Sequence, residues 1–226
     1  SFATFAPGTE RNVVKVRKDA PLELLGPLGC GIQTGAGAII NTLSVSSGRS
    51  VAIFGVGSVG LSAVMAARLV NASPIIALDV LDHRLDRALD LGATHTVNTQ
   101  SEPADEAIER IAPHGVDVAL DTTAVAPLMR QAIQSLAPRG TFGFVAVPPE
   151  GEFPVDLGHL LRGGRRVRGV VQGDSKPHVF IPALVDFYMQ GRLPIDKIVT
   201  YYPFDRIDDA FGDSRAGTAV KPVLRF

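Results

Sequence analysis

A glycine-rich turn between a strand and a helix constrains this chain more than any other feature. Residues 51–54 are apolar and predict a buried strand, which runs directly into a Gly-x-Gly-x-x-Gly turn at Gly55, Gly57 and Gly60. Gly55 allows the tight reversal, Gly57 lets backbone N–H groups approach a pyrophosphate, and Gly60 lets the following helix pack on the sheet. Because that helix directs its positive N-terminal end at the same place, the turn predicts a dinucleotide site.

The residues after the turn support the same interpretation. A helix rich in small residues (61–70) is followed by an apolar strand (75–78) that ends on Asp79, 19 residues beyond Gly60. An acid at this distance can accept hydrogen bonds from an adenosine ribose. Its charge would repel a 2′-phosphate, which favours NAD over NADP. Methyltransferases use a related turn, but they usually carry an acid just before the first glycine, where this chain is apolar.

Composition and charge describe a soluble globular protein. Hydrophobic residues make up 46% of the 226 residues and charged residues 20%, which is enough for a sizeable core. The net charge of −1 and the lack of a basic run argue against nucleic-acid or membrane partners. No apolar stretch approaches the ~20 residues of a membrane span, and no signal peptide opens the chain. The one cysteine, Cys30, excludes an internal disulfide, so we expect a cytoplasmic protein.

Strand and helix patterns alternate regularly along most of the chain. Near-continuous apolar strands suit a parallel sheet buried on both faces, and helical crossovers suit a doubly wound α/β fold. The expected strands are 51–54, 75–79, 94–97, 116–121, 141–147 and 167–171. The expected helices are 35–43, 59–71, 82–91, 103–112, 125–137 and 156–162. We therefore expect a six-stranded parallel sheet.

The pattern changes at both ends of the chain. Residues 2–6 and 13–16 predict short extended segments, which cannot form a core by themselves. After residue 172 we expect, in order, a helix at 179–190, a strand at 199–202, a helix at 206–213 and a strand at 219–226. These ends predict a second domain, so the expected divisions are 1–28, a dinucleotide-binding domain at 29–172, and 173–226.

Three sequence blocks carry a resemblance to a known family. They are residues 26–38, the glycine turn with Asp79, and residues 217–226. Together they resemble the zinc-dependent medium-chain alcohol dehydrogenases over essentially the whole chain, with the family's 25-residue step from the cysteine to the first glycine. The first block, which reads Gly-Pro-Leu-Gly-Cys-Gly-Ile-Gln-Thr-Gly-Ala-Gly, is most similar to the aryl (benzyl) alcohol dehydrogenases. The resemblance implies a Rossmann domain with remnants of a second, GroES-like catalytic domain at both ends, and thus a C-terminal fragment of such an enzyme.

The resemblance assigns a metal-binding role to Cys30. In the family, the cysteine of the Gly-Cys-Gly block is one of three protein ligands to a catalytic zinc, and a thiolate between two glycines is sterically open for this role. Without the block, a small buried hydrophobe is the ordinary interpretation of one cysteine. The family's other two ligands and its proton-relay groups fall before Ser1. The resemblance therefore implies that this chain binds cofactor but by itself holds no zinc, contains no catalytic residue and is inactive.

The resemblance assigns cofactor contacts more completely. Ser58 and Val59 begin the helix beneath the pyrophosphate, and Val59 matches the residue behind the nicotinamide ring. Thr34 matches a cofactor-site threonine. Arg84 matches a basic residue near the adenosine ribose, and Lys221 one that reaches the pyrophosphate. The alternative for both cations is an ordinary solvated surface charge.

The end of the fifth expected strand matches the segment that meets the nicotinamide carboxamide. Val145 and Val147 lie there, and Val147 is expected to face the substrate pocket with residues 170–172 nearby, although valine is also what buried strands contain. The expected cofactor residues are Thr34, Gly55, Gly57, Ser58, Val59, Gly60, Asp79, Arg84, Val145, Val147 and Lys221.

For the complete enzyme, the resemblance implies NAD-dependent oxidation of a primary alcohol, with an aromatic alcohol favoured, to an aldehyde. Zinc would act as a Lewis acid, and hydride would pass to the nicotinamide. Two alternatives stay open: a zinc-free quinone or enone reductase of the same fold, and a catalytically silent NAD-binding module such as a redox sensor or a structural protein. The five histidines lack metal-ligand spacing and are expected to be structural: His83, His95, His114, His159 and His178.

Assembly is predicted from the edge of the sheet. The sixth strand should leave backbone N–H and C=O groups open, and the extended apolar segment 151–155 could cover that edge from a partner. Related dehydrogenases commonly dimerise through this part of the cofactor domain, so the resemblance implies a homodimer with its interface near residues 152–172.

Overall fold

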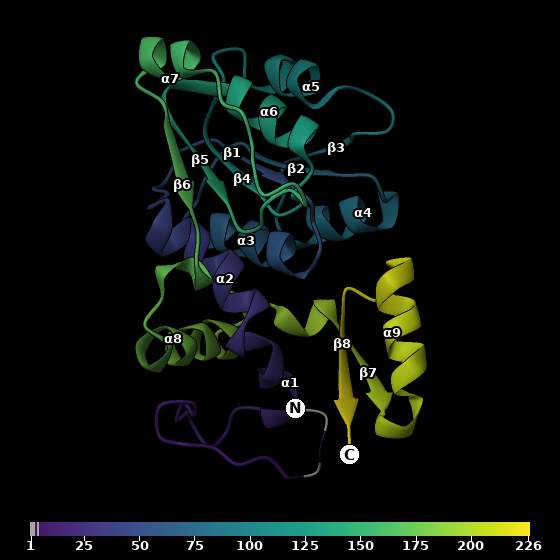
Figure 1. The fold of residues 1–226 in the computed structure, drawn as a ribbon. Coiled ribbons are helices and arrows are strands. Elements are labelled where there is room, and N and C mark those ends of the chain that lie inside the picture. Colours follow the sequence, from purple (N-terminus) through teal and green to yellow (C-terminus); the bar gives the residue numbers. More distant parts are fainter. Residues whose placement is uncertain (1–2, 4) are drawn as a thin grey trace.

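A computed structural model describes residue 3 and residues 5–226, and a six-stranded parallel sheet forms the centre of this described chain (Figure 1). The strand order is β3-β2-β1-β4-β5-β6, so the progression of strands reverses between β1 and β4. This order defines a doubly wound, Rossmann-type α/β fold, and the expected fold class is confirmed. The strands are β1 (Val51–Phe54), β2 (Ile75–Asp79), β3 (His95–Asn98), β4 (Val116–Asp121), β5 (Leu136–Phe144) and β6 (Arg166–Gly169).

The sheet separates two hydrophobic cores, because successive side chains of a strand point to opposite faces. In β1, Val51 and Ile53 join one core, whereas Ala52 and Phe54 join the other. The first core is covered by α2 (Gly31–Gly37), α3 (Ser58–Leu69) and α4 (Asp82–Leu91). The second is covered by α5 (Ala104–Ile111), α6 (Ala126–Gln134) and α7 (Leu157–Gly163). Figure 1 shows these two helical layers on opposite faces of the sheet.

Glycines let α2, α3 and the turn approach one another closely. A Cβ at Gly60 would overlap the carbonyl oxygen of Gly55, and a Cβ at Gly35 would overlap that of Val59. The backbone of α3 can therefore lie against the turn on one side and against α2 on the other only because these positions lack side chains. This packing fixes the start of α3 relative to the end of β1.

A smaller part lies at the other end of the molecule, where β7 and β8 pair in parallel, whereas η2 and η3 stay beside α2 (Figure 1). The chain terminus at Phe226 lies at this end, as does the segment before α1. The remaining elements are α1 (Leu22–Leu25), η1 (Gly26–Gly29), η2 (Ala38–Thr42), η3 (Gln172–Asp174), α8 (Pro177–Met189), η4 (Ile195–Ile198), β7 (Val199–Pro203), η5 (Phe204–Arg206), α9 (Ile207–Ala216) and β8 (Lys221–Arg225).

Several element ends differ from the sequence expectation. The helix expected at 35–43 begins four residues earlier as α2 and continues as the π-helical η2, because its glycines serve close packing despite their low helix propensity. β5 starts at Leu136, which pairs with Val116 ahead of a register irregularity, and ends three residues before 147. β6 is shorter than the expected 167–171. Residues 13–16 lack assigned secondary structure, and residues 2 and 4 of the segment 2–6 lie outside the described residues.

The helices are short relative to a lipid bilayer. In the part of the chain that the structure describes, none combines the length and apolar character needed to cross a membrane.

Candidate functional site

The glycine turn joins β1 to α3 at the carboxyl end of the sheet. Gly55 has a φ of +82°, in the left-handed region that favours glycine, and a Cβ there would lie 2.7 Å from the Thr122 Oγ1. α3 begins at Ser58, and no side chain among the described residues caps its first turn. The first N–H groups of α3 are therefore open to an anion, which the helix dipole also favours.

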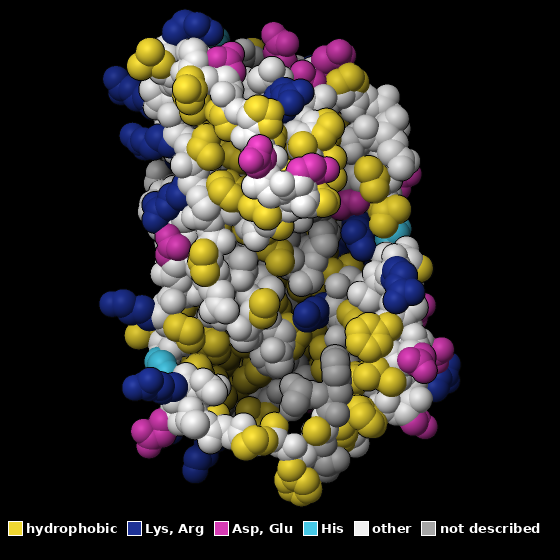
Figure 2. All heavy atoms as spheres, viewed as in Figure 1, with side chains coloured by type: hydrophobic (Ala, Val, Ile, Leu, Met, Phe, Trp, Pro, Cys, Tyr) yellow, Lys and Arg dark blue, Asp and Glu magenta, His cyan; other side chains and the backbone are white. Residues whose placement is uncertain are grey.

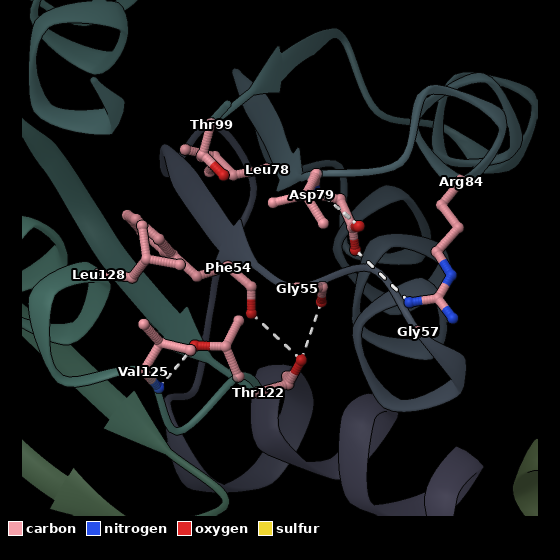
Figure 3. A pocket seen from close by; sticks show the side chains of 12 residues that line it. Phe54, Gly55, Gly57, Leu78, Asp79, Arg84, Thr99, Thr122, Val125 and Leu128 are labelled. Atoms are coloured by element: carbon pink, nitrogen blue, oxygen red, sulfur yellow. Dashed lines mark hydrogen bonds and ion pairs between the residues drawn. The ribbon is translucent and has the colours of Figure 1, made fainter. Parts of the chain in front are cut away.

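A cavity of about 320 Å³ opens beside the turn. It lies where β1, β2 and β4 end, at the reversal of strand order, which is where doubly wound sheets bind their ligands. Figure 3 shows side chains from these strand ends gathered around it. The lining residues are Phe54, Gly55, Gly57, Leu78, Asp79, Val80, Arg84, Thr99, Thr122, Thr123, Val125 and Leu128.

The carboxylate of Asp79 is held in place at the end of β2. The residue is 8% exposed, and its Oδ2 accepts a hydrogen bond from the Val56 N–H at 2.8 Å. Its Oδ1 accepts from the N–H groups of Val80 at 2.8 Å and Leu81 at 3.1 Å. A carboxylate offers about four acceptor sites, so these three bonds leave room for a further donor such as a ribose hydroxyl.

Arg84 approaches Asp79 from the first turn of α4 (Figure 3). Its Nη1 lies 4.0 Å from the Asp79 Oδ2, and its buried Nε has no hydrogen-bond partner within the described residues. Beside it, the His83 Nε2 donates to the Gly217 carbonyl oxygen at 2.9 Å. A Cβ at Gly217 would lie 2.8 Å from the Leu81 side chain and 3.0 Å from the Arg84 Nη2. The segment after α9 therefore packs directly against the start of α4.

Lys221 and Ser58 line a second cavity, of about 450 Å³, which also reaches the α3 N-terminus. Its lining residues are Ser58, Ile207, Ala210, Phe211, Ser214, Val220, Lys221, Pro222 and Leu224. The C-terminal part thus contributes a cation near the start of α3. The structure brings Gly55, Gly57, Asp79 and Arg84 to one cavity and places Lys221 in its neighbour.

Cys30 is exposed and immediately precedes α2. The Thr34 hydroxyl donates to the Cys30 carbonyl oxygen at 2.8 Å, and a Cβ at Gly31 would lie 2.8 Å from the Ser58 Oγ and 3.8 Å from Val59. Cys30 therefore lies close to the first turn of α3. Across residue 3 and residues 5–226, no group of three His, Cys, Asp or Glu side chains could hold a metal ion. The described residues do not fit a zinc ion without further ligands.

The expected nicotinamide segment divides into a half-buried and an exposed part. The Val145 N–H donates to the Asp121 carbonyl oxygen at 3.2 Å, and its side chain packs against the first core. Val147 is exposed and lines a cavity of about 460 Å³ with Thr123 and Pro148. Val147 thus opens toward solvent near the β4 end and does not line the cavity that holds Asp79.

The residues after β4 were missed by sequence reasoning. Thr122, Thr123 and Val125 line the first cavity, and Asp121 behind them is fully buried. Burial raises the pKa of the Asp121 carboxyl, against hydrogen bonds from Thr123 and Ala124 that lower it. The available signal was an acid that ends a buried strand and is followed by two threonines.

The fold and the turn define a doubly wound α/β protein with a glycine-rich turn at its switch point, and comparison with known proteins specifies its family. A family model described as zinc-binding dehydrogenase matches residues 58–189. Geraniol dehydrogenase from Castellaniella defragrans is 44% identical over 228 residues, which cover 100% of this chain and 61% of that protein.

Solved structures agree. An alcohol dehydrogenase zinc-binding domain protein from Burkholderia ambifaria has a TM-score of 0.94 and 51% identity, covering 96% of this chain and 59% of that chain. Benzyl alcohol dehydrogenase from Acinetobacter calcoaceticus has a TM-score of 0.94 and 45% identity, covering 96% and 60%. The chain belongs to the zinc-binding dehydrogenase family, which confirms the resemblance in its sequence. It spans about three fifths of the length of these relatives.

Proposed function

We propose that this chain is the cofactor-binding part of an NAD-dependent alcohol dehydrogenase. The observation that carries the proposal is the uncapped start of α3 beside the buried Asp79, in a cavity at the switch point of the sheet. Residues 29–172 would form the cofactor domain, and residues 1–28 and 173–226 would belong to a second domain. Several family members named above are alcohol dehydrogenases, which supports the reaction class.

The residues of the turn fit the pyrophosphate of a dinucleotide. Open N–H groups at the start of α3 would donate to the phosphate oxygens, and Lys221 would add a positive charge from the neighbouring cavity. Asp79 would accept a hydrogen bond from the adenosine ribose. The bound nicotinamide would supply the hydride-accepting chemistry.

Asp79 supports NAD over NADP. Its ionised carboxylate would repel a 2′-phosphate at the position where it accepts a ribose hydroxyl. Arg84 is the one nearby cation lining this cavity among the described residues, and its Nη1 is within 4.0 Å of Asp79. The positive charge of Arg84 is therefore already paired with the carboxylate of Asp79, which leaves it less suited to bind a 2′-phosphate.

The proposed substrate is a primary alcohol, with an aromatic alcohol favoured. Benzyl alcohol and geraniol, named for two relatives, are both primary alcohols whose carbinol carbon is bonded to an unsaturated carbon. This shared chemistry supports an allylic or benzylic alcohol. The product would be the corresponding aldehyde.

We propose that Cys30 is a zinc ligand in the whole protein, where the other ligands come from outside this chain. Changing Cys30 to Ser would remove the thiolate. We expect zinc content and alcohol oxidation to fall at least tenfold, with NADH affinity unchanged within about twofold. Metal analysis, turnover of benzyl alcohol and NADH fluorescence titration test this. Retained zinc and turnover in the variant would contradict the metal role, and absence of NADH binding by the wild type would contradict the proposed function.

We also propose a homodimer through the edge of the sheet. β6 lies at the end of the strand order, and apolar side chains near it are exposed, including Leu161 at 84% and Val171 at 77%. Phe153 and Val155 pack on the chain's own second core, so they are less suited than expected to reach a partner. Val170 is likewise buried. In Figure 2, Lys and Arg side chains follow the same edge, so association would depend on the apolar groups between them.

A further inference from the structure

The end of β4 holds the glycine turn through one threonine side chain. The Thr122 N–H donates to the Phe54 carbonyl oxygen at 2.9 Å. The Thr122 hydroxyl lies 3.1 Å from that oxygen and 2.9 Å from the Gly55 carbonyl oxygen, so its one proton is shared between them (Figure 3). These two carbonyls belong to the residues at which the chain leaves the sheet and reverses.

The residues on either side of Thr122 are joined by a network of hydrogen bonds. The buried Asp121 carboxylate accepts from the Thr123 hydroxyl at 2.7 Å, the Thr123 N–H at 3.2 Å and the Ala124 N–H at 3.0 Å. The Thr123 Oγ1 in turn accepts from the Val125 N–H at 3.0 Å. Ala124 has a φ of +58°, a conformation that costs free energy for a residue with a Cβ. These bonds fix the course of the chain directly after Thr122.

The turn is therefore braced from both neighbouring strands. On the β2 side, Asp79 accepts from the Val56 N–H, and on the β4 side Thr122 donates to the two preceding carbonyls. Rotation of the Gly55 peptide would break the Thr122 bond and would redirect the N–H groups that follow. Those N–H groups are the ones the proposed function assigns to the pyrophosphate.

We propose that Thr122 is a positioning residue for dinucleotide binding, whose hydroxyl fixes the direction of the N–H groups of the glycine turn. This inference rests on the proposed function. It predicts that the two parts of the adenosine diphosphate group depend on different residues. Binding of the phosphates depends on the orientation of the turn, whereas binding of the adenine and ribose depends on Asp79 and the apolar lining.

The test compares three variants in the whole protein. Thr122→Val keeps the shape but removes the hydroxyl, and loss of one well-placed hydrogen bond should weaken NADH and ADP-ribose binding about tenfold. Thr122→Ser keeps the hydroxyl and should stay within about twofold of wild type. Thr200→Val, at an exposed threonine on β7 that lines neither the cavity at Asp79 nor the one at Lys221, is the matched control and should also stay within about twofold. If the Val variant does not fold, Thr122→Ala removes the same hydroxyl and leaves a smaller side chain.

The affinity for adenosine, which lacks the phosphates, distinguishes a positioning role of Thr122 from a general structural role. Competition by NMR should show adenosine affinity unchanged in Thr122→Val while ADP-ribose affinity falls. An equal loss for adenosine and ADP-ribose, or failure of Ser to restore binding, would overturn the inference. A wild-type protein that binds adenosine and ADP-ribose but not NADH would overturn the proposed function, and a wild type that binds NADH with no loss in Thr122→Val would overturn only the role of Thr122.

Discussion

At the scale of single residues, Asp79 combines two tasks. Its carboxylate orients the backbone on both sides of the cavity through Val56, Val80 and Leu81, and it carries the charge that would select the ribose. Hydrogen bonds to charged groups contribute more than neutral ones. A change at this position would therefore alter the hydrogen bonds that hold the turn and, under the proposed function, the choice of cofactor.

Changing Asp79 to Ala should narrow the preference for NADH over NADPH. We expect NADH affinity to fall roughly 10–100-fold, because a charged acceptor is lost, and NADPH affinity to change much less, because repulsion of the 2′-phosphate is lost as well. Fluorescence titration with both cofactors measures the ratio. Asp90→Ala, at an exposed acid in the last turn of α4, should leave the ratio unchanged. A wild-type protein that prefers NADPH would refute the assignment.

The site could be predicted in part from the sequence. The turn and Asp79 follow from local spacing, because a strand, a turn, a helix and a second strand are consecutive in the chain. Thr122 could not be found in this way, since it reaches the turn only when β4 is placed beside β1. Its role depends on strand order, which local spacing does not contain.

At the scale of elements, the sequence predicted the ends of a strand correctly where the whole strand is buried. β1 and β2 are buried along their whole length, and their apolar runs predicted both with correct ends. The starts of β5 and α2 differ from the sequence expectation. β5 begins earlier because Leu136 pairs with β4, and α2 begins earlier because its glycines pack closely on α3. Where a neighbouring element decides the boundary, the local sequence carries too little information.

Gly60 tests the close contact between α3 and the turn. We expect Gly60→Ala to lower the free energy of unfolding by roughly 1–3 kcal/mol, because its Cβ would overlap the Gly55 carbonyl oxygen and force the helix away. Gly212→Ala, in the exposed helix α9, is the matched control. No described atom lies within 4 Å of a Cβ there, so helix propensity should stabilise that variant by up to about 1 kcal/mol. Urea unfolding distinguishes the two, and equal effects would contradict the packing argument.

Asp121, at the end of β4, makes the stability of the fold depend on pH, and the direction of this effect follows from its pKa. Burial raises its pKa above the ordinary value of 3.8, so the native state takes up a proton more readily than the unfolded chain. The contribution of this residue to stability therefore increases as pH falls through the folded-state pKa toward 3.8, and is lost as pH rises. Asp121→Asn cannot titrate. Between about pH 7 and about pH 4, urea unfolding should show wild-type stability rising relative to this variant, and a relative fall would be the contrary result.

At the scale of the whole molecule, the proposed dimer depends on exposed apolar groups at one end of the sheet. We expect the wild-type protein to be a dimer at micromolar concentration and Val171→Asp to weaken association at least tenfold, because a charge would be buried in the interface. Val179→Asp is the matched control, since Val179 is similarly exposed but lies on α8. Light scattering measures both. A monomeric wild type, or equal weakening by both variants, would contradict this interface.

The bonds from three backbone N–H groups to Asp79 also bear on how a ligand enters. They form within the folded chain, so the carboxylate already has its orientation before any ligand binds. The Asp79 side of the cavity is therefore preorganised, and the entropy of ordering it is lost during folding and not during association with a ligand. Recognition at this end should resemble docking into a rigid receptor, with the same backbone before and after binding.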